Sequence, residues 1–218
     1  MEPRRRHRPR HGNLIGALAL VGVVALGMSG CFTGERPTLA HEPSTGSAAV
    51  DAVVDRVNDL GDAVYTATYD VVTTFDGKST TVRASQSGTS RRSLTIGDIR
   101  YLVDGSSTRT CTVSTGECVD VIDASRVSDV QMTPDFFGTS LSARLRRDAE
   151  VAVSEPTAST EQIQGQAATC AAIPVDGATN TYCVLDNGVL ARLAAGDLVV
   201  TMTAYEPGAD ASLFTEGG

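Results

Sequence analysis

The chain contains no tryptophan, and its three histidines, His7, His11 and His41, all precede residue 47. The part that we expect to fold therefore lacks the usual base of Ser-His-Asp and Cys-His catalysis and has no histidine to bind a metal. P-loop, dinucleotide-binding and G-x-S-x-G motifs are also missing. A glycosidase-like pair of carboxylates stays open in principle, but the acidic residues are spread over turns and polar faces. We predict a protein that is not an enzyme and needs no cofactor or metal.

Basic residues are scarce and uniform. The chain has 18 basic and 26 acidic residues, which gives a net charge of −8. Seventeen of the basic residues are arginines, and the other is Lys78. A nucleic-acid-binding protein needs a basic face, so this balance argues against a nucleic-acid partner.

The first thirty residues have the pattern of a secretory signal peptide. Five arginines precede residue 14, and residues 14–28 are apolar and uncharged. Fifteen residues fall short of the roughly 20 that cross a bilayer, which leaves a short uncleaved anchor as the weaker alternative. We therefore assign residues 1–30 to a signal peptide, and the motif at its end makes it a lipoprotein signal peptide.

The sequence MSGC at 28–31 resembles the lipobox of bacterial lipoproteins. The resemblance implies cleavage before Cys31 and acylation of this residue, and two or three acyl chains would anchor the protein stably. Residues 31–46 mix proline, glycine, threonine and charge, which is typical of a tether. Without residues 1–30, 13 basic and 25 acidic residues remain, so the net charge becomes −12. We predict a lipid-anchored protein on the extracytoplasmic face of the cell membrane.

A helical period begins the folded domain, 47–218. Ser47 is a suitable N-cap and Gly61 a suitable end. The buried face of this predicted helix has apolar side chains at spacings of three and four: Val50, Val53, Val54, Val57 and Leu60.

The apolar period then changes to two, which predicts an antiparallel meander of six strands. Asp76-Gly77 favours the first hairpin turn. The expected strands run from Val64 to Phe75 and then over 78–86, 90–96, 99–104, 107–113 and 118–122. On the first strand we expect one buried face to contain Tyr65, Ala67, Tyr69, Val71 and Phe75.

A second helix is predicted from Thr133-Pro134, because threonine caps helices and proline suits the first helical position. Phe137, Leu141 and Leu145 would form its buried stripe. Three arginines, Arg144, Arg146 and Arg147, lie near its end, where a solvated position is favoured over a contact with lipid phosphates. Four more strands follow between about 160 and 206, with turns at 176–177, 187–188 and 196–197. Leu213 and Phe214 in the short tail are expected to dock onto the domain.

The five cysteines divide into one and four. With a two-residue turn at Asp176-Gly177, the numbers of two residues that face each other across the hairpin add up to 353. Cys170 therefore faces Cys183, at a non-hydrogen-bonded position. A four-residue loop similarly places Cys111 opposite Cys118. Secretion favours disulfides, and each would contribute about 2–3 kcal/mol. A four-cysteine metal site is the alternative, but six and twelve intervening residues do not fit metal-knuckle spacing.

These elements predict an α+β fold: a strongly curled antiparallel sheet of about ten strands, a half-barrel, with helices covering its concave face. Four stretches carry a family resemblance over roughly 47–214: residues 68–75, GQAATC at 165–170, TYCVLDNGVLARL at 181–193, and Leu213-Phe214. There the chain resembles the LolA-like lipoprotein carriers, especially the actinobacterial lipoproteins of the LppX/LprG type. The resemblance implies a hydrophobic cavity that binds or carries lipid or glycolipid acyl chains. It transfers no ligand-contacting residue.

Two functions follow from this prediction. The first is an extracytoplasmic, membrane-anchored protein that binds or carries lipid in a cavity. The second is a non-catalytic structural or interaction module with a filled core, displayed on the cell surface. The volume and lining of a cavity would distinguish them, whereas the oligomeric state does not follow from the sequence.

Overall fold

The computed structural model describes residues 44–215, which belong to the second of the two units of the chain, Pro43–Gly218. The predicted signal peptide 1–30, the predicted lipidation site Cys31 and most of the tether 31–46 lie outside the described residues. Among the described residues, no helix is long and apolar enough to cross a membrane.

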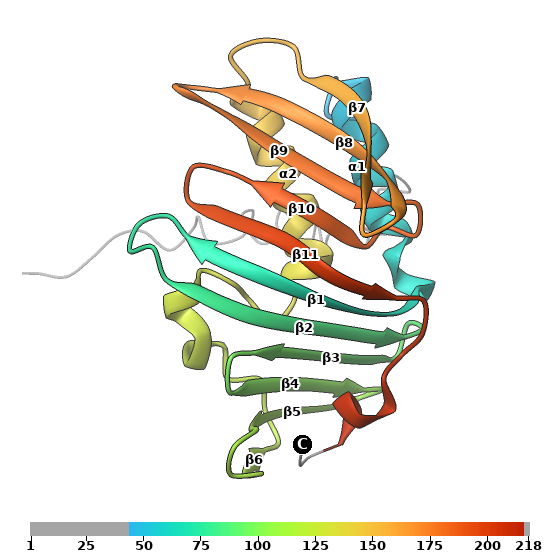
Figure 1. Cartoon of the computed structure of the whole chain (residues 1–218), viewed down its shortest axis with the longest axis vertical. Coiled ribbons are helices and arrows are strands. Elements are labelled where there is room, and N and C mark those ends of the chain that lie inside the picture. The colour runs from blue at the N-terminus through green and yellow to red at the C-terminus, as the bar shows by residue number, and fades with distance from the viewer. Residues whose placement is uncertain (1–43, 216–218) are drawn as a thin grey trace, which may run out of the picture. The chain divides into compact units, whose positions relative to one another are not determined.

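One antiparallel sheet of eleven strands forms the framework (Figure 1). Its order is β6-β5-β4-β3-β2-β1-β11-β10-β9-β8-β7, so two meanders are joined by the pairing of β1 with β11. The first meander consists of β1 (Val64–Thr73), β2 (Ser79–Ser87), β3 (Arg91–Ile96), β4 (Ile99–Asp104), β5 (Ser107–Thr112) and β6 (Cys118–Val119). The second consists of β7 (Thr157–Ile163), β8 (Gln166–Val175), β9 (Ala178–Leu185), β10 (Leu190–Ala194) and β11 (Leu198–Glu206).

The six-strand meander is confirmed, but the second meander has five strands where we expected four. The missed turn is Gln164-Gly165, whose φ angles of 51° and 73° suit a type I′ hairpin. A glutamine in this position gives no turn signal in the sequence. The edge strand β6 has two residues, which is shorter than the predicted 118–122.

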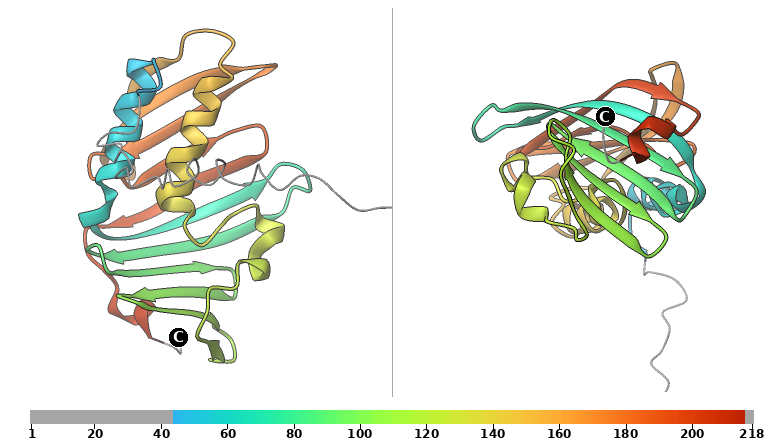
Figure 2. Two further views of the ribbon diagram at one scale, coloured as in Figure 1. Left: turned by 180° about the vertical axis from the view of Figure 1, so that it is seen from behind. Right: turned by 90° about the horizontal axis from the view of Figure 1, so that it is seen from below.

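Two α-helices, α1 (Ala48–Asn58) and α2 (Leu141–Glu150), lie on the same face of the sheet, which we call the helix face (Figure 2, left). The predicted valine stripe of α1 is buried, as is Leu60 in the following 3-10 turn η1 (Asp59–Asp62). Ser47 is the N-cap residue, but its side chain makes no capping bond. The carboxylate of Asp51 instead accepts hydrogen bonds from Ser44 and Thr45.

The β9–β10 turn packs closely against α1. A Cβ atom on Gly188 would lie 2.1 Å from the carbonyl oxygen of Arg56, and the φ angle of Gly188 is +81°. This position therefore requires glycine for both its conformation and its contact. The side chain of Arg56 pairs with Asp186 in the same turn at 2.7 Å.

The predicted start of the second helix was wrong. The chain first forms the 3-10 segment η2 (Ala124–Val130), then a π-helical turn, η3 (Phe136–Ser140), and α2 begins only at Leu141. Gly138 interrupts the path with φ −126° and ψ −117°. The hydroxyl of Thr133 donates to Asp135 rather than capping a helix. The expected stripe is nevertheless confirmed, because Phe137, Leu141 and Leu145 are all buried.

Alternation along β1 is confirmed for four of the five residues that we placed on its buried face. Tyr65, Ala67, Tyr69 and Val71 are buried on the helix face, but Phe75 is 93% exposed. The strand ends at Thr73, so Phe75 lies in the hairpin tip, where alternation no longer applies. On the opposite face of β1, Thr66 is also buried, beneath the C-terminal segment described below.

The fold is thus α+β, with an open sheet whose edge strands are β6 and β7. The sheet bends at the β7 edge. The side chain of Gln164 donates to the carbonyl of Met202 in β11 at 3.2 Å, although four strand spacings, about 19 Å in a flat sheet, separate β7 from β11. The α-helices cover β7–β11, whereas no α-helix of the described residues lies over the helix face of β3–β5 (Figure 2, left).

Candidate functional site

A groove runs along the helix face of β3–β5, where the α-helices do not reach. Its wall is the connection between β6 and α2, which crosses these strands from residue 120 to residue 138. Two hydrogen bonds hold this wall: Tyr101 donates to the carbonyl of Asp123 at 2.9 Å, and Thr110 to that of Val121 at 2.7 Å. Strand alternation brings the apolar residues of β3 and β4 to the same face.

The groove has a volume of about 370 Å³. This lies toward the lower end of the range for ligand pockets in proteins. Five of its eight lining residues are apolar or aromatic, and only two carry charge. The lining consists of Arg92, Leu94, Tyr101, Val103, Thr108, Ile122, Pro134 and Asp135.

A second, smaller cavity of about 40 Å³ continues from the groove toward the end of α1, sharing Arg92, Leu94, Pro134 and Asp135 with it. Phe137 lines it, and the ring of Phe137 stacks on Tyr69 with centroids 4.6 Å apart. The hydroxyl of Tyr69 is fully buried and has no hydrogen-bond partner among residues 44–215. Burial therefore raises the pKa of Tyr69 well above its usual value, with smaller contributions from Tyr65 and Tyr205.

Asp135 is a fixed negative charge at the wall of the groove. Burial alone would raise its pKa, but hydrogen bonds from Thr133, Thr139 and Ser140 outweigh this effect and hold the pKa below its usual value. Thr133 donates to one carboxylate oxygen and Thr139 to the other, each at 2.8 Å. The carboxylate is thus bound within its own loop, which it stiffens.

The space between the helices and the sheet is occupied by side chains. Between α2 and β9, Tyr182 donates to Asp148 and accepts from Arg144, while Asn180 donates to Asp148 at 2.7 Å. Arg144 also pairs with Asp197, which lies in the turn before β11. Burial, followed by the bond to Asp148, raises the pKa of Tyr182. The helices are therefore bound to the sheet by polar as well as apolar contacts.

Both predicted disulfides are present, and both lie on the face opposite the helices. Cys170 faces Cys183 and Cys111 faces Cys118, each pair with Cα atoms 4.0 Å apart. The predicted register is confirmed, including the pairing of Pro174 with Thr179.

The carboxylate of Glu161 lies within 4.8 Å of the sulfurs of Cys170 and Cys183. Because these sulfurs are bonded to each other, they supply no thiolate for a metal. Glu161 instead pairs with Arg192 at 2.6 Å.

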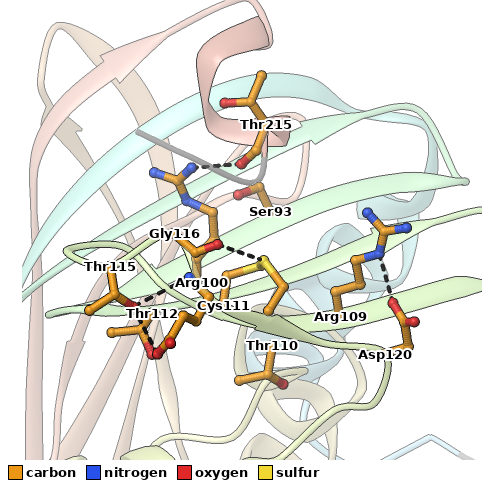
Figure 3. Close-up of a disulfide and its surroundings, with 12 residues drawn as sticks. Ser93, Arg100, Arg109, Thr110, Cys111, Thr112, Thr115, Gly116, Asp120 and Thr215 are labelled. Carbon is orange, nitrogen blue, oxygen red and sulfur yellow. Dashed lines mark hydrogen bonds and ion pairs between the residues drawn. A yellow bond between two sulfur atoms is a disulfide. The ribbon is translucent and has the colours of Figure 1, made fainter.

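The C-terminal segment, residues 207–215, packs on the same opposite face, behind the groove. Leu213 is 2% exposed, so its predicted docking is confirmed. Thr66 donates to the carbonyl of Gly208 at 2.8 Å, Ser93 to that of Leu213 at 2.6 Å, and Arg100 to that of Thr215 at 2.9 Å beside the Cys111 disulfide (Figure 3).

The ring of Phe214 lies 4.7 Å from the guanidinium of Arg91. A hollow of about 540 Å³ borders Phe214 and Thr215 on this face. The segment thus satisfies the polar groups on the back of the strands that form the groove.

The groove residues were not singled out from the sequence. The strands 90–96 and 99–104 were predicted, but no face was assigned on them; alternation along them puts Leu94 with Ile96, and Tyr101 with Val103, on one face. What the sequence did not indicate is that residues 120–138 would form the wall: we expected Ile122 in the strand 118–122 and Asp135 at the start of the second helix.

No protein-family model and no curated protein matches the chain. Among solved structures, the MucA/MucB complex of Pseudomonas aeruginosa is 14% identical, with a TM-score of 0.47 over 76% of this chain and 60% of that one. A structure of MucB alone is 14% identical, with a TM-score of 0.44 over 75% of this chain and 60% of that one. A LolA superfamily protein from Nitrosomonas europaea is 8% identical, with a TM-score of 0.37 over 76% of this chain and 97% of that one.

The chain spans about 60% of the length of these MucB chains. All three TM-scores are below 0.5, so these similarities assign neither a family nor a function to this chain.

Proposed function

We propose that this protein is a non-enzymatic binding protein that holds an acyl chain in the groove on the helix face of β3–β5. The observation that carries the proposal is the groove itself: about 370 Å³, lined mainly by Leu94, Tyr101, Val103, Ile122 and Pro134. Apolar area removed from water contributes about 25 cal/mol per Å², so a hydrocarbon chain is a favourable occupant of such a lining. As the resemblance to the LolA-like carriers implies, this protein would bind an acyl chain on its sheet. In this proposal the acyl chain lies beside the α-helices and not beneath them.

We further propose that Cys31 is lipidated and that residues 31–46 tether the domain to the extracytoplasmic face of the cell membrane. The lipobox-like MSGC at 28–31, after a basic and an apolar stretch, supports this anchor. Replacement Cys31→Ser tests it, because the protein should move from the membrane fraction to the soluble or culture fraction. If the Cys31→Ser protein stays membrane-bound by apolar residues 14–28, the uncleaved anchor is the better explanation.

Filling the groove tests the binding proposal. Thr108 is half-buried on β5 and lines the groove, so Thr108→Trp would place an indole in the acyl-chain path. We expect at least a tenfold loss of affinity for a fluorescent long-chain fatty acid, measured on the full chain carrying Cys31→Ser so that its own acyl chains do not compete. Thr201→Trp is the matched control, because Thr201 is exposed on β11 outside the lining. Since the chain lacks tryptophan, each variant has a single indole, and its emission reports the fold and the ligand directly.

The second candidate is an interaction module without an apolar ligand. The filled space between helices and sheet favours it, since Leu141, Leu145, Tyr182 and Leu193 are all fully buried there. No fatty-acid binding by the parent protein would favour this module, and equal binding by Thr108→Trp and Thr201→Trp would contradict the groove as the binding site.

A further inference from the structure

Arg92 differs from the other arginines of the groove half in having no partner of its own. Among residues 44–215, its side chain forms no ion pair and no hydrogen bond. Its neighbours in the sheet are all engaged: Arg83 pairs with Asp210, Arg91 with Asp104 and Arg109 with Asp120. A guanidinium carries five N–H donors, so Arg92 has its full donor capacity available.

Strand alternation places Arg92 at the junction of the groove and the smaller cavity, both of which it lines. It faces Gln86 on β2 and Val103 on β4 across the ladder. Its Nη1 atom lies 3.9 Å from the position that a Cβ on Gly138 would take, which locates the guanidinium beside the groove wall. The cation therefore borders an apolar surface formed by Leu94 and Val103.

The other charged lining residue, Asp135, does not neutralise Arg92. The two side chains form no ion pair, and both carboxylate oxygens of Asp135 already accept hydrogen bonds from threonines of its own loop. The groove thus offers one cation with free donors and one anion whose two oxygens each already accept a hydrogen bond. The partner that complements this arrangement is an anion.

Resting on the proposed function, we propose that the ligand is a single-chain amphiphile with an anionic head group, a carboxylate or a phosphate ester, which Arg92 binds in a two-pronged contact. Guanidinium and carboxylate or phosphate match in a fork-to-fork geometry, and such charge-assisted bonds are about twice as strong as neutral ones. The hydrocarbon chain then extends along Leu94, Tyr101 and Val103. The volume of about 370 Å³ suits one chain rather than two.

The test compares oleate with oleyl alcohol, which has the same chain and no charge, by titration calorimetry on the full chain carrying Cys31→Ser. We expect the protein to bind oleate at least tenfold more tightly, and Arg92→Gln to reduce oleate binding to the level of the alcohol. The matched control is Arg147→Gln, which removes the same charge from an exposed position on α2 outside the groove. It should leave both affinities unchanged. Oleyl phosphate distinguishes a phosphate head from a carboxylate, and inorganic phosphate alone should bind negligibly.

The outcomes separate the two proposals. Equal binding of oleate and oleyl alcohol, or equal losses in Arg92→Gln and Arg147→Gln, would overturn the role of Arg92 while leaving the acyl-chain groove standing. Binding of neither amphiphile would overturn the proposed function itself. Tight binding of inorganic phosphate without a chain would mean that Arg92 recognises a soluble anion, which also contradicts the amphiphile.

Discussion

The two ends of the sheet are built differently. Under the helices, β8–β10 bury apolar side chains on both faces, including Ile173, Leu193 and the disulfide of Cys170 with Cys183, none of which is exposed. In the groove half, β3–β5, the helix face is partly open, and the opposite face buries polar groups such as Ser93 and Arg100. One sheet thus combines a fully packed end with an end that keeps a hollow.

The difference shows how a hollow can be kept in a folded domain. Strands that leave one face open lose apolar burial, and they need support from elsewhere. Here the C-terminal segment supplies it from behind: the backbone carbonyls of residues 208, 213 and 215 accept bonds from Thr66, Ser93 and Arg100. Buried polar groups are tolerated because each has a partner. The packed end therefore anchors the fold and the groove end is available for binding.

The largest expected effect on stability comes from shortening a buried side chain at the packed end. Leu145 on α2 is fully buried, so Leu145→Ala should lower the free energy of unfolding by about 3 kcal/mol, within the usual range for buried leucines. Val103→Ala, on the half-buried groove lining, should cost less than about 1 kcal/mol, because little packing is lost at an open wall. Urea unfolding followed by circular dichroism measures both. Equal costs would mean that the groove half is packed as tightly as the helix half, against the comparison above.

The next effect compares the disulfides, one at each end of the sheet. In the chain-entropy account, the pair separated by 13 residues, Cys170–Cys183, should contribute about 3 kcal/mol, and the pair separated by 7, Cys111–Cys118, about 2.5 kcal/mol. The difference between the two contributions should be larger than this account gives, because Cys170 and Cys183 are both fully buried whereas Cys118 is half-buried. Thermal unfolding of the two double Cys→Ser variants checks the order. A larger loss from Cys111→Ser/Cys118→Ser would place the more important constraint at the groove end.

Much of the packed end was predictable, apart from the turn at Gln164-Gly165 and the strand β7 that precedes it. The valine stripe of α1, the Asp176-Gly177 turn and the Cys170–Cys183 register follow from local period and turn chemistry, and all are confirmed. Phe75 was misplaced because alternation was extended beyond the end of a strand into a hairpin tip.

The groove wall was missed for a different physical reason. Thr133-Pro134 has the local pattern of a helix start, but the hydroxyl of Thr133 donates to Asp135 and does not cap a helix. The backbone of Gly138 also has non-helical dihedral angles. The resulting π turn places Phe137 on Tyr69, a contact between residues 68 positions apart that no local pattern reports. Sites built from such contacts depend on tertiary packing rather than on propensity.

The smallest expected effect acts on the groove end through Asp135. Its pKa is lower in the folded protein than the usual value near 3.8, because Thr133, Thr139 and Ser140 donate to its carboxylate and outweigh the effect of burial. A carboxyl group with a lowered pKa contributes stability above its unfolded pKa and loses that contribution as the pH falls through the folded value. We expect Asp135→Asn to be less stable than the parent protein at pH 6, and the gap to close below about pH 4. Urea unfolding at pH 6 and at pH 3 measures it, with Asp120→Asn, exposed beyond β6, as the control for other carboxylates. If the difference in stability between Asp135→Asn and the parent protein is the same at both pH values, the hydrogen bonds that hold the loop do not need the charge. The stiffness of the groove wall would then not depend on the ionisation of Asp135.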